Sequence, residues 1–328
     1  MKKRNIKFDV LKVIALFAIL FAHIEPTALA FQLRNFDVPL MIIISVWLSL
    51  EIYSKKNFNY KYYIIKRVKR LVIPTWIFLT IYFFINWILK KTFSAKTIIL
   101  SYTLINGIGY IWIIRIYIYI AIISPIYFYI YKNLKKINVI IIILIEYLIY
   151  IFLVRFSFIV DERINLIITI SLLDFLGYSF IVWIAIFTYK INIKKRGLIS
   201  VFFIVLFSFL MVKYNFAPTQ QFKYPIRLYY LVYSFSIIFM LDFLFEWINK
   251  KYSIKENKFI IYISSNSMWI YLWHILYIPI VNQFFISIKL GYILRFILIV
   301  FLAIMTTMIQ NLGISLIKKK NLEIFLNL

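Results

Sequence analysis

Histidine supplies the best candidates for acid–base chemistry in this chain, which contains two, His23 and His274. Imidazole has an unperturbed pKa of about 6.5, so a neutral ring can take a proton from a hydroxyl group near neutral pH. Both histidines lie in long apolar runs, where a polar side chain normally faces a partner, a cavity or water. We predict that His23 is a general base and that Glu25 is a candidate orienting partner. The alternative for His23 is a neutral ring in an interhelical hydrogen bond.

Helical spacing relates each histidine to other polar residues. Lys12 and His23 are eleven positions apart, so at about 100° and 1.5 Å per residue they lie within roughly 20° of the same helix face and about 16 Å apart along the axis. One helix face therefore carries two polar groups at two depths, although Lys12 is also close enough to the end of its run to extend to the membrane surface. His274 shares a face with Tyr271 and Ser267, and we expect it to line the same cavity as His23.

Cations would have to bind any phosphorylated donor, because the chain has six glycines and neither a Walker loop nor a G-x-G-x-x-G pattern. Arg67 and Arg70 are three residues apart on one helix face, and guanidinium groups suit bidentate phosphate binding. Their alternative is the usual excess of basic residues on the cytoplasmic side. Arg115 is a further cation in an apolar run, and its alternative is an ion pair with Glu146 or Asp174.

The elements that must position these residues are membrane helices. Hydrophobic residues make up 64% of the 328 residues, and apolar runs recur along the whole length. The expected spans are 8–29, 37–53, 71–89, 108–131, 137–154, 164–188, 197–214, 226–248, 258–283 and 289–317. No Gly/Ser linker, repeat or long polar insert separates them. We predict an all-α polytopic membrane protein, with about ten transmembrane helices in a single bundle and one domain, 1–328.

The net charge of +26 has a membrane explanation. It would suggest nucleic acid in a soluble protein, but cytoplasmic loops of membrane proteins collect Lys and Arg, so we expect no nucleic-acid partner. On the expected topology 25 Lys and Arg residues lie on the side of the N-terminus and 11 on the other side. We therefore expect a multi-pass protein of the plasma membrane, surrounded by membrane lipid, with both termini in the cytoplasm.

Residues that are rare or misplaced narrow the alternatives. The absence of cysteine excludes disulfides, thiolate metal sites and a cysteine nucleophile, and with two histidines we predict no metal cofactor. The basic N-terminus, the apolar run 13–22 and the small residues 28–30 also resemble a cleavable signal peptide. Asp9, Lys12 and His23 lie around and within that run, which favours a retained membrane helix.

Five stretches, in order along most of the chain, together resemble the acyltransferase-3 family of integral-membrane O-acyltransferases. They are Asp9-Val10-Leu11-Lys12 with His23 after ten intervening residues, Val38-Pro39-Leu40 through Ser45-Val46-Trp47, Arg67-Val68-Lys69-Arg70 with Pro74, Tyr110 to Arg115, and Ser267 to His274. Lys12 stands where the family has an arginine, which keeps the charge but loses the planar fork, and Val46 stands where it commonly has a glycine.

The resemblance implies a transmembrane acyltransferase domain. In it a cytoplasmic acyl-CoA, commonly acetyl-CoA, gives its acyl group to a hydroxyl of a cell-envelope glycan or lipid-linked sugar. His23 would take the proton of that hydroxyl, either in direct transfer or with a transient acyl-histidine. The residues expected to hold the donor are Lys12, Arg67, Arg70 and Arg115. Those expected to help at the acceptor are Glu25, Tyr271 and His274.

Two readings without acyl transfer remain open at this point. A polysaccharide exporter or flippase would use the same aromatic, cation-lined cavity and would move a glycan without consuming a thioester. A proton-coupled transporter would need a chain of titratable groups, and this sequence has only scattered ones.

Overall fold

The computed structural model describes residues 5–55, 57–285 and 291–326, and within these ranges the chain is helical and has no strand. The elements are α1 (Ile6–Ala22), α2 (Ala28–Leu33), α3 (Asp37–Tyr53), α4 (Tyr60–Ile88), α5 (Ala95–Tyr102), α6 (Trp112–Asn133), α7 (Lys136–Ser157), α8 (Glu162–Ile168), the π-helical turn η1 (Thr169–Leu173), α9 (Asp174–Thr188), α10 (Ile193–Lys213), the 3₁₀ turn η2 (Thr219–Phe222), α11 (Leu228–Tyr252), α12 (Lys258–Ser265), α13 (Ser267–Phe285) and α14 (Tyr292–Leu326). The prediction of an all-α protein is confirmed.

Eight of the described helices are long and apolar enough to cross a membrane, counting α2 with α3 as one and α8, η1 and α9 as another. The two remaining spans expected from the sequence correspond to α1 and to α12 with α13. α1 has 17 residues, which is at the lower end of the range for a spanning helix. The protein is therefore a polytopic membrane protein, as predicted.

Several expected spans have different limits in the structure, and three of them show why. The first stops at Ala22 rather than residue 29, because Pro26 disfavours the helical conformation at Glu25, whose φ is 53°. The span expected at 258–283 is divided at Asn266 into α12 and α13. α4 begins at Tyr60, well before the expected residue 71. Its start is capped by Asn59, whose side chain accepts a hydrogen bond from the Tyr62 amide at 2.9 Å.

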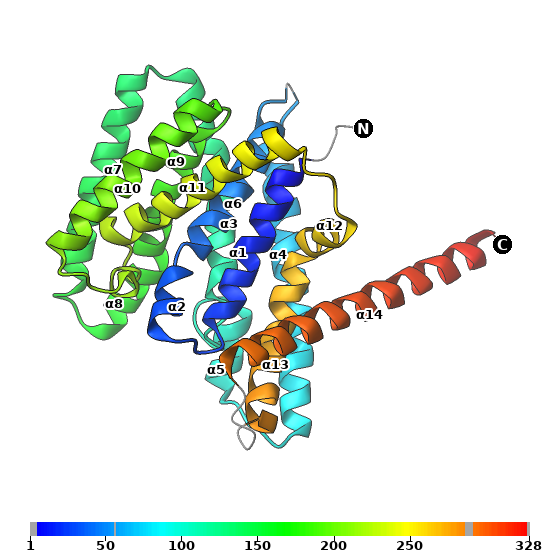
Figure 1. The fold of residues 1–328 in the computed structure, drawn as a ribbon. Coiled ribbons are helices and arrows are strands. Elements are labelled where there is room, and N and C mark those ends of the chain that lie inside the picture. The colour runs from blue at the N-terminus through cyan, green and yellow to red at the C-terminus, as the bar shows by residue number, and fades with distance from the viewer. Residues whose placement is uncertain (1–4, 56, 286–290, 327–328) are drawn as a thin grey trace.

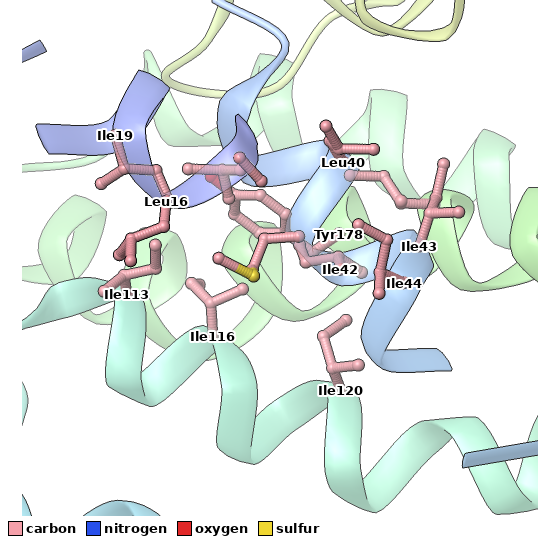
Figure 2. Packing of buried hydrophobic residues seen from close by; sticks show 14 of the residues in the cluster. Leu16, Ile19, Leu40, Ile42, Ile43, Ile44, Ile113, Ile116, Ile120 and Tyr178 are labelled. Carbon is pink, nitrogen blue, oxygen red and sulfur yellow. The ribbon is translucent and has the colours of Figure 1, made fainter. Parts of the chain in front are cut away.

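α1 lies within the bundle, where it packs against α3, α12 and α13 (Figure 1). α7 and α10 lie toward one side of the bundle, and α14 extends away from it toward the C-terminus. Figure 2 shows the core between α1, α3, α6 and α9, with Leu16, Ile42, Ile116 and Tyr178 all completely or almost completely buried. This packing holds α1 in a fixed position between its neighbouring helices.

Apolar side chains also cover the outside of the molecule. Phe152 of α7, Phe202 of α10 and Ile309 of α14 are each at least 60% exposed. A soluble protein would not leave so many large side chains in water, whereas a lipid environment solvates them. The outer helices therefore present the surface expected of a protein that is surrounded by lipid.

Buried charged groups away from the cavities described below have ion-pair or hydrogen-bond partners, as two examples show. Asp242 of α11 contacts Lys7 of α1 at 3.0 Å and also bonds Arg196 of α10. Glu146 of α7 accepts hydrogen bonds from several side chains, including Trp183 of α9 at 2.9 Å. Such pairs satisfy ionised groups that would otherwise be costly at membrane depth. These contacts also join neighbouring helices.

Candidate active site

One face of α1 lines two cavities in succession. Lys12, Leu16, Ile19 and His23 recur at steps of three and four residues, so they share a face. Lys12, Leu16 and Ile19 line the first cavity, and Ile19 and His23 line the second. The shared face predicted for Lys12 and His23 is therefore present, and it opens onto space rather than onto packed helices.

The first cavity, here called the cation cavity, contains Lys12, Arg67 and Arg70 in its lining. It lies between α1, α3, α4, α6 and α13 and has about 920 Å³ of space, including its opening. Apolar side chains, Met41 and Ile114 among them, make up much of the rest of its lining. Cations together with apolar lining residues suit a ligand that has phosphates at one end and a less polar arm.

Arg67 is held in place by neighbouring hydroxyl groups. Its Nε donates to the Tyr63 hydroxyl at 3.1 Å, and its Nη2 donates to Ser49 Oγ at 2.8 Å. The Tyr63 hydroxyl is in turn 2.7 Å from that of Tyr53, which is 2.7 Å from Ser124 Oγ. This network fixes the direction of the guanidinium group of Arg67, which lines the cavity.

Lys12 is directed toward α12. Its Nζ donates to the Ser264 carbonyl oxygen at 2.7 Å, in the last turn of α12, where carbonyl groups favour a nearby cation. The Ser264 hydroxyl donates to Asp9 Oδ1 at 2.6 Å, so both charged residues of the first motif hold the end of α12. Lys12 therefore lies at the wall of the cation cavity with a structural contact of its own.

The second cavity, here called the histidine cavity, is lined by His23 and by three charged residues, Arg34, Asp37 and Lys223. It has about 520 Å³ of space, including its opening. The aromatic side chains of Phe31, Trp112 and Tyr224 also line it. A charged and aromatic lining of this kind suits a polar ligand that has flat apolar faces, such as a sugar.

The two cavities share a wall made of Ile19, Ile113 and Tyr271. These residues come from α1, α6 and α13, and the Tyr271 hydroxyl donates a hydrogen bond to the Tyr110 carbonyl oxygen. A ligand in one cavity is therefore separated from a ligand in the other by a single layer of side chains. Tyr271, predicted to help at the acceptor, lies at this boundary.

His23 and His274 form a hydrogen-bonded pair, with Nδ1 of His23 2.8 Å from Nε2 of His274. Nδ1 of His274 contacts the Tyr271 carbonyl oxygen, which can only accept, so this nitrogen carries the hydrogen. With both rings neutral, Nε2 of His274 is then the acceptor and Nδ1–H of His23 the donor. This assignment from the hydrogen-bond network leaves a lone pair on Nε2 of His23, as a general base requires.

The structure places the remaining predicted site residues differently. His274 is completely buried behind His23 instead of lining the histidine cavity. Glu25 is exposed, and the orienting contact expected from it is made by His274. Arg115 donates to the carbonyl oxygens of Leu104, at 2.9 Å, and Ile105, and pairs with Asp174 at 2.7 Å. Arg115 is not among the described residues that line either cavity, and its contacts match the ion-pair alternative.

Several residues of the two cavities were missed by sequence reasoning. Arg34 and Lys223 lie between the expected spans, and nothing in the sequence brings positions 34 and 223 together. Burial lowers the pKa of Lys223, because the charged form loses its water, while the Asp37 carboxylate acts in the opposite direction. Tyr117 lines the cation cavity, and its buried hydroxyl has no hydrogen-bond partner in the described part of the chain. Within the described ranges, no group of three or more His, Cys, Asp or Glu residues is placed to hold a metal ion.

Comparison with known proteins gives one match. The acyltransferase-3 family model, described as an acyltransferase domain, matches residues 5–309 and so includes every cavity residue named above. No protein of curated function matches the chain. No solved structure matches it either.

Proposed function

The chain belongs to the acyltransferase-3 family and is a membrane acyltransferase, and we propose that it moves an acyl group, preferably acetyl, from acyl-CoA to a hydroxyl of a cell-envelope glycan or lipid-linked sugar. One observation carries the proposal: a cavity lined by cations and a cavity that contains a histidine meet at the wall of Ile19, Ile113 and Tyr271. Two cavities suit two substrates whose reacting groups must come together.

The donor is proposed to bind in the cation cavity. Arg67, Arg70 and Lys12 would receive the CoA phosphates, since a guanidinium group pairs with phosphate through two parallel hydrogen bonds. The apolar lining residues would receive the pantetheine arm and direct the thioester toward Tyr271. Arg115 has no part in this proposal, because its contacts are with Asp174 and backbone carbonyl groups.

The acceptor is proposed to bind in the histidine cavity, with its hydroxyl facing Nε2 of His23. This nitrogen takes the hydroxyl proton as the oxygen attacks the thioester carbonyl carbon. A C–O bond forms, the C–S bond then breaks, and the departing sulfur takes the proton from the imidazolium ring. The products are the acyl ester and the free thiol of CoA, so the protein ends the cycle unchanged.

The Tyr117 hydroxyl is proposed to stabilise the oxygen that becomes negative during this step. It is a buried donor with no described hydrogen-bond partner, it lies at the wall of the cation cavity, and it comes from α6, as does the shared-wall residue Ile113. A donor that is already in place and sheltered from water is the arrangement that lowers the barrier of acyl transfer most effectively. His274 acts through His23, whose tautomer it fixes, and is a positioning residue.

The charge distribution gives this reaction a direction. With 25 Lys and Arg residues on the side of the N-terminus and 11 on the other, both termini are proposed to lie in the cytoplasm, at the plasma membrane. The cation cavity lies toward the N-terminal end of α1 and so would be open to cytoplasmic acyl-CoA. The histidine cavity lies toward the other end, where a glycan on the outer side would bind.

Reconstitution tests this proposal against export. Protein in liposomes receives acetyl-CoA labelled in the acetyl group, together with the glycan fraction of cells that lack the gene. We expect label in the glycan and release of one thiol for each acetyl group transferred. Movement of glycan across the membrane with no thiol released would contradict acyl transfer and favour an exporter.

A further inference from the structure

The histidine cavity carries an excess of positive charge that the described residues lining it do not neutralise. Arg34, Asp37 and Lys223 all line it and are only 7%, 1% and 3% exposed, and they carry two positive charges and one negative charge. Buried charges are retained at membrane depth when they are paired or when they serve a ligand. One cation is therefore left over beside the proposed acceptor.

The single carboxylate is already used by other groups. Asp37 Oδ2 accepts from Arg34 Nη1 at 2.6 Å, and Oδ1 accepts from the Val38 amide at 2.7 Å. Nζ of Lys223 is farther away, at 3.5 Å from Asp37 Oδ1 and 3.4 Å from Asn35 Oδ1. An ammonium group has three N–H donors, and contacts of this length satisfy them poorly.

Arg34 also has an unused donor. Its Nε is buried and makes no hydrogen bond to any described residue, while its guanidinium carbon lies 3.8 Å from the centre of the Phe31 ring. A buried guanidinium N–H without an acceptor is costly, and an anion from the ligand would supply one. Two separate observations therefore come from residues that line one cavity: Arg34 has a donor without an acceptor, and Lys223 has an ammonium group with only long contacts.

On the proposed function, we infer that the acceptor is an anionic glycan, with a carboxylate or phosphate group close to the hydroxyl that is acylated. The anion binds Arg34 Nε and Lys223 Nζ, while the neighbouring hydroxyl faces Nε2 of His23. The aromatic side chains of Trp112 and Tyr224 line the same cavity and cover the sugar ring. The acyl transfer itself is unchanged, because the anion binds and orients the acceptor without reacting.

Binding of small sugars to the full chain in lipid nanodiscs tests the inference without any acyl donor. The probes are methyl glucuronoside for a carboxylate, glucose 1-phosphate for a phosphate, and methyl glucoside as the neutral sugar, at equal ionic strength. Tryptophan fluorescence follows the titration, since Trp112 lines the cavity. We expect at least one of the anions to bind at least about tenfold more tightly than the neutral sugar. Equal binding of all three, or no binding of either anion, would overturn the inference.

Variants assign the preference to this cavity. Lys223→Gln removes one of the two cations that bind the anion and should clearly reduce the preference for the anionic over the neutral sugar, whereas Lys223→Arg should keep the preference of the wild type. Lys213→Gln, at an exposed lysine in the last turn of α10, is the matched control and should leave the preference intact. Binding of acetyl-CoA is the control for folding: a Lys223→Gln variant with the acetyl-CoA affinity of the wild type is folded. A folded Lys223→Gln variant that retains the anion preference of the wild type would overturn the inference.

Acyl transfer to a neutral glycan at the same efficiency as to an anionic one would overturn this inference and leave the proposed function standing. Conversely, an anion preference that depends on Lys223, without transfer of an acyl group to any glycan, would contradict the proposed function and leave the anion site in place. The two claims therefore fail separately.

Discussion

Nδ1 of His23 lies 2.8 Å from Nε2 of His274, so the two histidines of the chain form one pair although they are 251 positions apart in sequence. The Tyr271 carbonyl oxygen contacts the other nitrogen of His274 and thereby sets the tautomer of both rings. A catalytic triad uses the same principle, in which a third group orients the base. Here a backbone carbonyl and a second imidazole take the place of a carboxylate.

Removal of His274 should therefore lower the activity of His23 as the base and leave the binding of the acyl donor unchanged. We expect His274→Ala to lower kcat on the order of 100-fold with the KM for acetyl-CoA unchanged, because the His23 ring loses the acceptor that holds its tautomer. His274→Gln should recover part of the loss, since an amide oxygen can accept from Nδ1–H of His23. Steady-state kinetics of the purified variants give both values. Equal losses for alanine and glutamine would point to a packing role for His274.

Arg67 should act on donor binding. Arg67→Lys keeps the charge but loses the planar fork and the bonds to Tyr63 and Ser49, so we expect the KM for acetyl-CoA to rise about tenfold with little change in kcat. Lys69→Gln, at an exposed residue of the same helix, is the control and should leave the KM unchanged. If Arg67→Lys and Lys69→Gln gave the same KM, Arg67 would have no special part in donor binding.

Tyr117→Phe removes the buried hydroxyl of a residue that lines the cation cavity and leaves its ring. Loss of a donor to the developing oxyanion should lower kcat on the order of 100-fold while both KM values stay close to those of the wild type. Tyr119→Phe is the control, because that hydroxyl donates to the Ile170 carbonyl oxygen at 3.0 Å, outside the cavities. A normal kcat for Tyr117→Phe would remove Tyr117 from the mechanism.

Arg115 should matter for stability and not for donor binding. Removing it by Arg115→Ala leaves the Asp174 carboxylate, which is 16% exposed, without its partner at 2.7 Å. We expect a loss of about 3 to 5 kcal/mol in the free energy of unfolding, seen as a lower Tm in detergent. The protein that remains folded should keep the KM of the wild type for acetyl-CoA. A raised KM at unchanged Tm would restore the earlier prediction that Arg115 holds the donor.

The sequence was sufficient for those features that depend on local pattern. Apolar runs and their lengths predicted the membrane helices, and the spacing of Lys12 and His23 predicted the face of α1 that lines both cavities. Arg67 and Arg70 both line the cation cavity, in agreement with the shared helix face that their spacing predicted. Each of these relationships spans only a few turns of one helix.

Features that depend on contacts between distant segments could not be predicted in the same way. Glu25 is near His23 in sequence, but the chain turns at Glu25 and Pro26, so the partner of His23 comes from α13 instead. Lys223 reaches Asp37 only because the connection between α10 and α11 packs against the start of α3. Tertiary packing decides such neighbours, and no periodicity within one helix reports them.

The most direct test of the central claim is acetyl transfer by His23→Gln compared with the wild type at matched expression in liposomes. Glutamine fills a similar space and its side-chain N–H can still donate to His274, but it provides no basic nitrogen. We predict transfer of label to the glycan below about 1% of the wild-type rate, as expected for the loss of a general base. Transfer at the wild-type rate would contradict the assignment of His23 as the catalytic base.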